Sequence, residues 1–262
     1  MATVLRLGRY PVKSFQGETL DSADVTDRGV PGDRRWAVVD QATGKALSAK
    51  REGRLLAAEA RTDPRSGRGP DGGTVIVRLP DGREHEAGDP GLDKAASAWL
   101  DRDVRVEQAR DDVPRVYEFN ISSEDESSPL LDIPCPTGTF LDLAAVHILT
   151  TASLRAIAAL YPDGAWELPR FRPTVVVEAD GDEFVEDEWI GRAVRIGGAG
   201  GVVLNPFMPT VRCTMTTRAQ LGLPRDLDIA KTVNRQHGGS LGIYCTVVEP
   251  GRVSVGDALT VG

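Results

Sequence analysis

Turn residues interrupt this chain so often that no long regular element fits between them. The sequence holds 28 Gly and 17 Pro but only 5% aromatic residues. Gly and Pro end helices and occupy tight turns, so this punctuation favours many short elements over a helical bundle. With 262 residues, the chain is long enough for one large or two small domains with a real core. We therefore expect a mostly β (α+β) protein.

The first hundred residues alternate short apolar segments with Gly- and Asp-containing turns. Such alternation predicts strands over 4–10, 20–26, 35–40, 55–61 and 74–79. Asp89-Pro90-Gly91 then precedes apolar residues at helical spacing, which predicts a short helix over 92–100. We expect residues 1–112 to form a small N-terminal β-barrel-like domain closed by this helix.

The second half predicts another β-rich unit with peripheral helices. A helix is expected over 151–161, and strands over 174–178, 194–196, 202–204, 243–248 and 253–261. Residues 120–129 are polar, acidic and aperiodic, which is typical of a mobile linker or lid. We place the domain boundary before that segment, so that the C-terminal domain spans 113–262.

Charge and cysteine content exclude several classes of protein. The formal charge of −8 argues against a nucleic-acid binder, which needs a concentrated basic face. No run of 18 apolar residues predicts a membrane span, and the start has no signal-peptide layout. We expect a cytoplasmic protein whose three cysteines are reduced, because they match neither a disulfide framework nor a zinc-ligand spacing.

Cys213 is the cysteine with the most suggestive neighbours. It follows Arg212 in a segment, Pro209 to Thr217, that is rich in hydroxyls. A neighbouring guanidinium favours the thiolate, which attacks electrophiles or binds soft metals. The alternative is a small, inert core residue.

Basic residues also gather at three predicted turns. Lys13 and Ser14 follow the first strand, Arg34 and Arg35 follow a Pro-Gly-Asp turn, and Arg170 and Arg172 flank Phe171. Ammonium, hydroxyl and guanidinium groups suit phosphate oxygens. Taken singly, each of these charges is more simply a solvated strand end.

Together, these segments resemble the MOSC family, whose members include the mitochondrial amidoxime-reducing components and their bacterial relatives. The resemblance covers nearly the whole chain and rests on motifs in the family's order: Tyr10-Pro-Val-Lys-Ser14, Gly32-Asp-Arg-Arg-Trp36, Leu149-Thr-Thr-Ala-Ser-Leu154, Phe171-Arg-Pro173, Arg212-Cys-x-x-Thr-Thr217 and Val255-Gly-Asp257. It implies a MOSC N-terminal β-barrel domain packed on a C-terminal MOSC β-barrel domain.

The resemblance also implies a molybdenum cofactor, a pyranopterin whose dithiolene sulfurs and one protein thiolate hold the metal; pyridoxal phosphate is not expected. Cys213 matches the metal ligand, and Asp142 occupies the position of a carboxylate near the metal, as a proton relay or merely a turn cap. Four more residues match the family's phosphate- and pterin-contacting positions, and three others are added as further candidate contacts. They are Lys13, Ser14, Arg34 and Arg172, with Thr150, Thr210 and Arg212 as the additions.

Two functions follow from the resemblance. The first is a reductase of small N-hydroxylated substrates (amidoximes, hydroxylamines, N-hydroxypurines), with electrons from a separate ferredoxin-, flavoprotein- or cytochrome-type donor. The second is a carrier that delivers the cofactor or persulfide sulfur without catalysis of its own. A metal-free, Cys-dependent lyase or transferase stays open as a third.

Two histidines and one loop complete the expectations. His147 lies among apolar residues and is interpreted as a satisfied core histidine. His237 precedes two glycines. It is expected either at the rim of the cofactor pocket or in a plain turn. Arg218 and the residues after it depart from the Val-Asp-Pro turn of amidoxime reducers, so the substrate wall is expected to differ more than the cofactor contacts.

Overall fold

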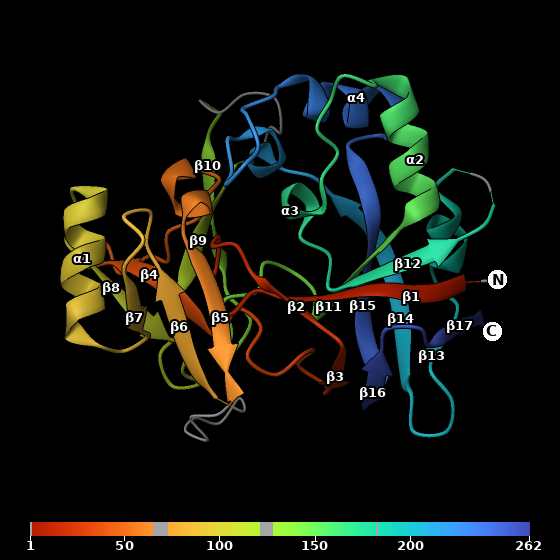
Figure 1. Ribbon diagram of the computed structural model, residues 1–262, viewed down its shortest axis with the longest axis horizontal. Helices are drawn as coiled ribbons and strands as arrows, with labels where there is room; N and C mark the ends of the chain where they lie inside the picture. The colour runs from red at the N-terminus through yellow and green to blue at the C-terminus, as the bar shows by residue number, and fades with distance from the viewer. Residues whose placement is uncertain (1, 65–72, 121–127, 182) are drawn as a thin grey trace.

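Strands dominate the structure, as the turn spacing predicts. The computed structural model describes residues 2–64, 73–120, 128–181 and 183–262. Two β-rich parts lie side by side, with the helix α1 at the outer edge of one part and both chain termini at the outer edge of the other (Figure 1). The fold class inferred from the sequence is confirmed.

The first part consists of short sheets and one helix. Its elements are β4 (Trp36–Asp40), the 3₁₀ turn η1 (Gly53–Ala57), β5 (Glu59–Asp63), β6 (Thr74–Arg78), β7 (Glu84–Glu86), α1 (Pro90–Leu100) and β8 (Val104–Gln108). The short strands β2 (Glu18–Leu20) and β3 (Ser22–Val25) precede them in the chain but pair with strands of the second part. β4 pairs with β8, and β5, β6 and β7 form a three-stranded sheet. α1 begins where predicted because Asp89 accepts a hydrogen bond from the Gly91 amide and Pro90 follows it.

The second part is a closed barrel of seven strands that includes β1 (Ala2–Arg9), the first strand of the chain. The strand order is β12-β11-β15-β14-β13-β17-β1, and β1 also pairs with β12 to close the ring. β11 and β12 run parallel, whereas the other neighbours are antiparallel. An odd number of strands cannot alternate all the way around a barrel, so one parallel pair is required.

The remaining elements follow residue 112 in the chain. They are β9 (Val116–Asn120), β10 (Leu130–Pro134), β11 (Val146–Thr150), α2 (Thr151–Leu160), α3 (Leu168–Phe171), β12 (Val175–Ala179), η3 (Val185–Trp189), β13 (Val194–Ile196), β14 (Val202–Val211), η4 (Thr214–Thr217), α4 (Asp228–His237), β15 (Ser240–Glu249), β16 (Gly251–Ser254) and β17 (Ala258–Val261). β9 and β10 pair as a hairpin that lies between the two parts (Figure 1).

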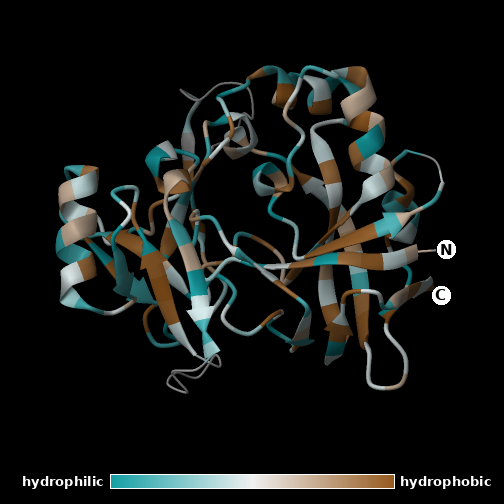
Figure 2. Ribbon diagram, viewed as in Figure 1, coloured by the Kyte–Doolittle hydropathy of each residue, from teal (hydrophilic) through white to brown (hydrophobic). Residues whose placement is uncertain are grey.

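Two apolar cores stabilise the two parts. Val4, Ile148, Val177, Ile243 and Cys245 are among the residues buried in the barrel. A second cluster joins the sheets of the first part to α1, with Val12, Phe15, Val38, Leu55 and Leu92 among its members. Hydrophobic and hydrophilic residues alternate along many of these strands (Figure 2), as expected where one face packs on a core and the other meets solvent.

The structure differs from the predicted elements in several places, and the strands β7 to β11 and the helix α3 were not predicted. The predicted strand 55–61 is η1 followed by β5, because Leu55 and Leu56 are both fully buried and do not alternate. The last predicted strand is two strands, β16 and β17, separated by a turn. α4 was not predicted from the sequence, and its N-terminus has no side-chain cap.

The domain boundary at residue 112 stays a prediction, since β1 and β3 pair with strands from the other end of the chain. The expected lid at 120–129 falls on residues 121–127, which lie outside the described residues. Within the described ranges, no helix is both long and apolar enough to span a membrane.

Candidate functional site

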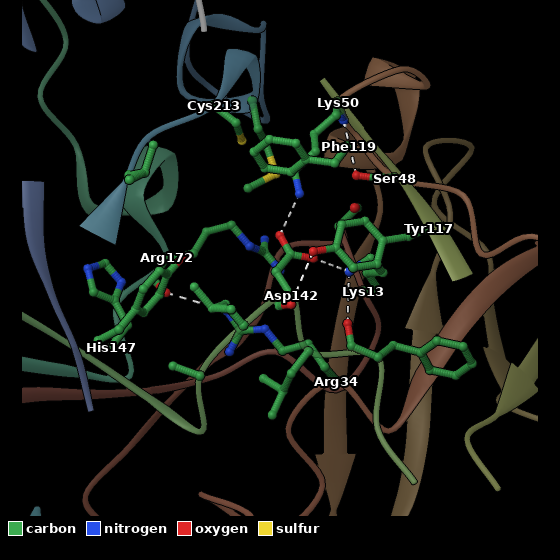
Figure 3. Close-up of a pocket in the computed structure, with 18 of the residues that line it drawn as sticks. Lys13, Arg34, Ser48, Lys50, Tyr117, Phe119, Asp142, His147, Arg172 and Cys213 are labelled. Atoms are coloured by element: carbon green, nitrogen blue, oxygen red, sulfur yellow. Dashed lines mark hydrogen bonds and ion pairs between the residues drawn. The ribbon is translucent and has the colours of Figure 1, made fainter. Parts of the chain in front are cut away.

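A cavity of about 350 Å³ lies where the two parts of the molecule meet (Figure 3). Its lining combines residues from the loops after β1 and before β4 with residues from the barrel and the β9–β10 hairpin. Seven of the residues predicted from the sequence are brought together here: Lys13, Ser14, Arg34, Asp142, Arg172, Arg212 and Cys213. Residues separated by up to two hundred positions therefore share one site.

Unusual backbone conformations are concentrated at this cavity. Among the described residues, five non-glycine residues have positive φ, and three of them line the cavity: Ser14 at 68°, Arg34 at 49° and Arg172 at 54°. A side chain in this left-handed region costs about 1–2 kcal/mol. Such strain clusters at functional sites, where the rest of the fold holds it in place.

Two buried lysines share the carboxylate of Asp142. Lys13 Nζ donates to Asp142 Oδ1 and, at 2.8 Å, to the carbonyl of Phe140. Lys50 Nζ donates to Asp142 Oδ2 at 2.8 Å. Both lysines are almost fully buried, whereas the Asp142 side chain remains about a third exposed. The carboxylate is thus the counter-ion that keeps two ammonium groups inside the protein.

The charges in this triad shift one another's pKa values. Burial alone would raise the pKa of Asp142, but the attraction of Lys13 and Lys50 outweighs it and holds that pKa far below its usual range. Burial lowers the pKa of Lys13. Burial also acts to lower the pKa of Lys50, yet Asp142, with a smaller contribution from Cys213, raises it above the ordinary value.

Aromatic rings complete the surroundings of the two ammonium groups. The centroid of the Tyr117 ring lies 4.1 Å from Lys13 Nζ and 4.5 Å from Lys50 Nζ. Phe119, on the same strand, lies 4.8 Å from Lys50 Nζ. These contacts favour the charged form of each amine.

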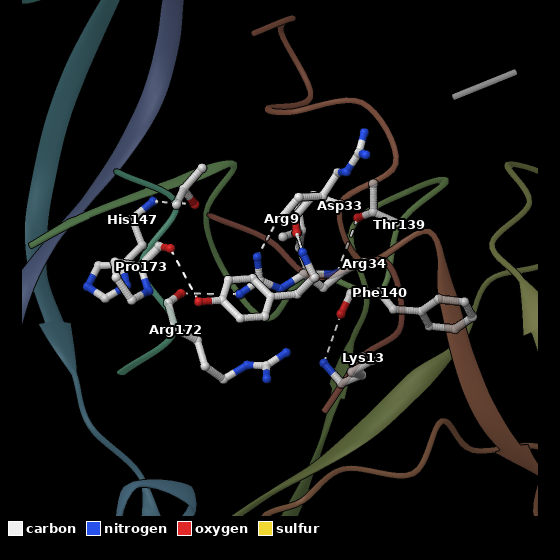
Figure 4. A network of polar contacts seen from close by, with 12 residues as sticks. Arg9, Lys13, Asp33, Arg34, Thr139, Phe140, His147, Arg172 and Pro173 are labelled. Carbon is white, nitrogen blue, oxygen red and sulfur yellow. Dashed lines mark hydrogen bonds and ion pairs between the residues drawn. The ribbon is translucent and has the colours of Figure 1, made fainter. Parts of the chain in front are cut away.

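A second cationic group is formed by three arginines. Arg34 pairs with Asp33, and the guanidinium groups of Arg34 and Arg172 lie 4.4 and 4.2 Å from the centre of the Tyr10 ring. Figure 4 shows Arg34 and Arg172 converging from different segments of the chain. Arg212 donates to the carbonyl of Phe171 at 2.7 Å. Burial, with the nearby charge of Arg34, lowers the pKa of Arg172 to about 10.

Several buried donors in this group lack a partner within the described residues. They are Nη2 of Arg172 and Nε of Arg212, together with Nε2 of His147. All three residues line the cavity. A buried polar atom without a hydrogen bond is costly, so such a cluster indicates a place for a polar, electron-rich ligand.

Cys213 is placed at the cavity by the end of β14 and the beginning of η4. It is partly exposed and lines the cavity, whereas Cys135 and Cys245, also in the described residues, do not. Cys245 is buried in the barrel core, and burial raises the pKa of its thiol. No group of three or more His, Cys, Asp and Glu side chains among the described residues could hold a metal ion by itself.

Two predicted contact residues do not line the cavity. The Thr150 hydroxyl caps α2 by accepting a hydrogen bond from the Ser153 amide, and it donates to Glu186 at 2.6 Å. Thr210 is fully buried in β14, and its hydroxyl has no partner among the described residues. The side chain of Thr150 is therefore occupied by the fold itself.

The two histidines have different environments. His147 is buried in β11 and lines the cavity with an unpartnered Nε2, so it is not the satisfied core residue expected from the sequence. Burial, aided by the charge of Arg212, holds its pKa well below the ordinary value. His237 is not a lining residue. It ends α4, stacks on Phe184 and pairs with Asp187 through Nε2 at 2.7 Å.

Sequence reasoning missed Lys50 and the apolar part of the lining. Lys50 lies in the charged run Ala49-Lys-Arg-Glu52, which is typical of solvated surface, and only the distant Tyr117 and Phe119 reveal its burial. The lining also includes apolar side chains, namely Phe119, Ile133, Leu143, Met208, Val211 and Met215. The cavity thus combines cationic and apolar groups.

The cavity combines one lining thiol, Cys213, with cationic side chains and strained backbone, and such a lining suits an anionic ligand. The family comparison is more specific. Residues 1–112 match the MOSC N-terminal beta barrel domain and residues 137–260 match the MOSC domain. The chain belongs to the MOSC domain family, as its motifs predict.

Individual relatives are distant. A protein named molybdenum cofactor sulfurase from Drosophila erecta is 28% identical over 269 aligned positions, which cover 94% of this chain. The chain spans only about a third of the length of that relative, 32%. Among solved structures, the YUAD protein from Bacillus subtilis aligns with a TM-score of 0.50 at 14% identity, over 98% of this chain and 93% of its own. That likeness supports the fold alone.

Proposed function

We propose that the cavity binds the molybdenum cofactor, so that this protein acts in molybdenum cofactor-dependent chemistry. The observation that carries the proposal is that one thiol, Cys213, lines the same cavity as two buried donors without a partner among the described residues, Nη2 of Arg172 and Nε of Arg212. A soft thiolate suits a sulfur-bound redox metal, and guanidinium groups suit phosphate and pterin oxygens. The name of the Drosophila relative supports the same cofactor.

The residues present fit this group. Lys13, Ser14 and Arg34, which all line the cavity, would hold the phosphate. Arg172 and Arg212 would donate to the pterin. A chain of formal charge −8 holds an anionic ligand only by gathering cations locally, and this cavity gathers five against the single carboxylate of Asp142.

We further propose reduction of N-hydroxylated compounds as the reaction. When bound, the cofactor supplies two-electron redox chemistry, with electrons from a separate ferredoxin-, flavoprotein- or cytochrome-type donor. The residues of the chain then bind and orient the substrate. The apolar side chains of Phe119, Met208 and Met215 suit the carbon skeleton of an amidoxime, and the ammonium groups suit its hydroxyl.

Replacing the thiol tests the proposal. Protein made in a cofactor-competent host is expected to contain molybdenum and to reduce benzamidoxime with a chemical electron donor. Cys213→Ser is expected to abolish the reduction, whereas the control Cys135→Ser, outside this cavity, retains it. Unchanged activity in Cys213→Ser, measured as benzamidine formed, would remove the reductase from consideration.

A second candidate is a carrier that delivers the cofactor or persulfide sulfur. The match to a cofactor sulfurase favours it, and so does the altered segment after Thr217, beginning with Arg218. Protein that reduces no N-hydroxylated compound, yet passes molybdenum cofactor to a cofactor-free acceptor enzyme, would support the carrier over the reductase.

A further inference from the structure

The Lys50 ammonium combines a fixed position with unused donor capacity. Its acceptor among the described residues is Asp142 Oδ2 at 2.8 Å, although an ammonium carries three N–H groups. Lys13 uses two acceptors, Asp142 and the Phe140 carbonyl. Lys50 is therefore the amine with more N–H groups available to a molecule in the cavity.

The backbone of Lys50 is tied to the turn that carries Cys213. Its carbonyl accepts a hydrogen bond from Arg218 Nη2 at 2.7 Å and from the Thr214 hydroxyl at 3.5 Å. Thr214 directly follows Cys213 in η4. In Figure 3 the Lys50 side chain lies between Cys213 and Asp142. The backbone of Lys50 is thus held by the turn that carries Cys213, and its amine is held by Asp142. Such fixation is the preorganisation that catalytic groups need.

We propose that Lys50 is a catalytic residue, which donates a hydrogen bond and then a proton to the departing oxygen of an N-hydroxylated substrate. This proposal rests on the reductase function proposed above. The N–O bond breaks and two electrons come from the donor protein. The departing oxygen takes one proton from Lys50 and leaves as water. The nitrogen takes the second proton from solvent and forms an N–H bond, so two electrons and two protons are consumed.

Lys50 suits this role better than its neighbours. An arginine does not release its proton, and the Tyr117 hydroxyl already donates to the Asp142 carbonyl at 3.1 Å. The ammonium of Lys50 is stabilised by Asp142 and two rings, so it is charged throughout the neutral range. Transfer to a departing hydroxide is still downhill, because water has a pKa of about 15.7. Water reaches the pair at the partly exposed Asp142 and restores the proton.

Two substitutions separate hydrogen bonding from proton transfer. In cofactor-loaded protein without an electron donor, calorimetry measures benzamidoxime binding with no turnover. Lys50→Met is expected to weaken benzamidoxime binding by about tenfold, because it removes one hydrogen bond from a charged group. It is expected to leave benzamidine binding unchanged, because benzamidine lacks the oxygen that would accept this hydrogen bond. Lys50→Arg keeps the charge and the donors, so it retains binding but loses about 100-fold or more in kcat, the usual contribution of a general acid.

Controls keep the outcomes distinct. Lys94→Met, at an exposed position of α1, is expected to match the unchanged protein in both assays. Molybdenum content and thermal melting verify that each variant is loaded and folded, and Lys50→Gln replaces any variant that is not. Three outcomes would each overturn the proposal. They are a benzamidoxime affinity of Lys50→Met equal to that of the protein without substitution, no benzamidoxime binding by the protein without substitution, and full kcat in Lys50→Arg. Binding as expected without any reduction would contradict the reductase instead, and would leave Lys50 as a ligand-binding residue only.

Discussion

At the scale of single residues, Asp142 controls the charge of the site. Within the described residues it is the one carboxylate that lines the cavity, and it neutralises part of the charge of Lys13 and Lys50. An ion pair inside a protein is costly to break, because the remaining charges lose their partner without regaining water. Asp142 therefore contributes to stability as well as to the site.

Asp142→Asn is expected to lower the free energy of unfolding by about 1–2 kcal/mol near pH 7, less than a fully buried pair because solvent reaches this carboxylate. The folded pKa of Asp142 lies below its unfolded value of about 3.9, so its contribution is complete above that pH and is lost as the pH falls further. Denaturant melts of both proteins between pH 2 and pH 6 would show the difference shrinking below about pH 4.

The matched control for this substitution is Asp112→Asn. Asp112 pairs with Arg110 on the surface, where both side chains are about two-thirds exposed, 66%. Such an exposed pair contributes little to stability, because solvent screens its attraction. If Asp142→Asn destabilised the protein no more than Asp112→Asn, the shared carboxylate would not be the counter-ion of the two lysines.

Residues of the site differ in how far the sequence reveals them. Cys213, Lys13 and Arg34 could be predicted because each lies in a short motif with a fixed order along the chain. Lys50 could not, since its burial depends on contacts with Tyr117 and Asp142, which lie far away in sequence. Motifs report local chemistry, whereas burial of a charged residue in a loop depends on tertiary contacts.

At the scale of elements, α2 is fixed by a buried polar cluster at its N-terminus. Thr150 and Ser153 each donate to the same oxygen of Glu186 at 2.6 Å. Thr150 also accepts from the Ser153 amide, which satisfies one free donor of the first turn. The motif that resembles a cofactor contact thus also carries a helix cap.

Thr150→Ala is expected to lower the free energy of unfolding by about 1–2 kcal/mol, since it removes the cap and one donor to Glu186. Molybdenum and pterin content should stay unchanged, because the Thr150 side chain does not line the cavity. Denaturant melts and elemental analysis measure the two quantities. Loss of cofactor without loss of stability would mean that the hydroxyl contacts the cofactor after all.

Elements with regular patterns were predicted well. β13 has the predicted bounds, Val194–Ile196, and α2 differs from its prediction by one residue. The failures have physical reasons. η1 is a short 3₁₀ turn with two consecutive buried leucines, and α4 begins without a cap at Leu227. Patterns of period 2 or 3.6 describe long amphipathic elements better than short, fully buried turns.

At the scale of the whole molecule, the barrel depends on the first strand of the chain. β1 fills the gap between β12 and β17 and pairs with both. Without it, both of these strands would present an unpaired edge, which promotes aggregation. Closure by β1 was not predictable from local patterns, because pairing partners so far apart in sequence leave no periodic signal.

A fragment of residues 10–262 lacks β1 and is expected to lose cooperative thermal unfolding. Removal of β1 opens the barrel and exposes the part of the barrel core that packs against Val4 and Leu7. Circular dichroism melting of the fragment, alone and with a synthetic peptide of residues 1–9, measures this. Restoration by the peptide is the expected result. A cooperative transition of the fragment alone, at the melting temperature of the whole chain, would show that the barrel does not need β1.

The central claim is that a molybdenum cofactor lies in this cavity with the Cys213 sulfur on the metal, and X-ray absorption at molybdenum tests it most directly. The protein and its Cys213→Ser variant, both made in a cofactor-competent host, would be compared by the number of sulfur atoms bound to the metal. We predict one sulfur fewer in the variant. The same sulfur count in both proteins, or no molybdenum and no pterin in the unchanged protein, would contradict the claim.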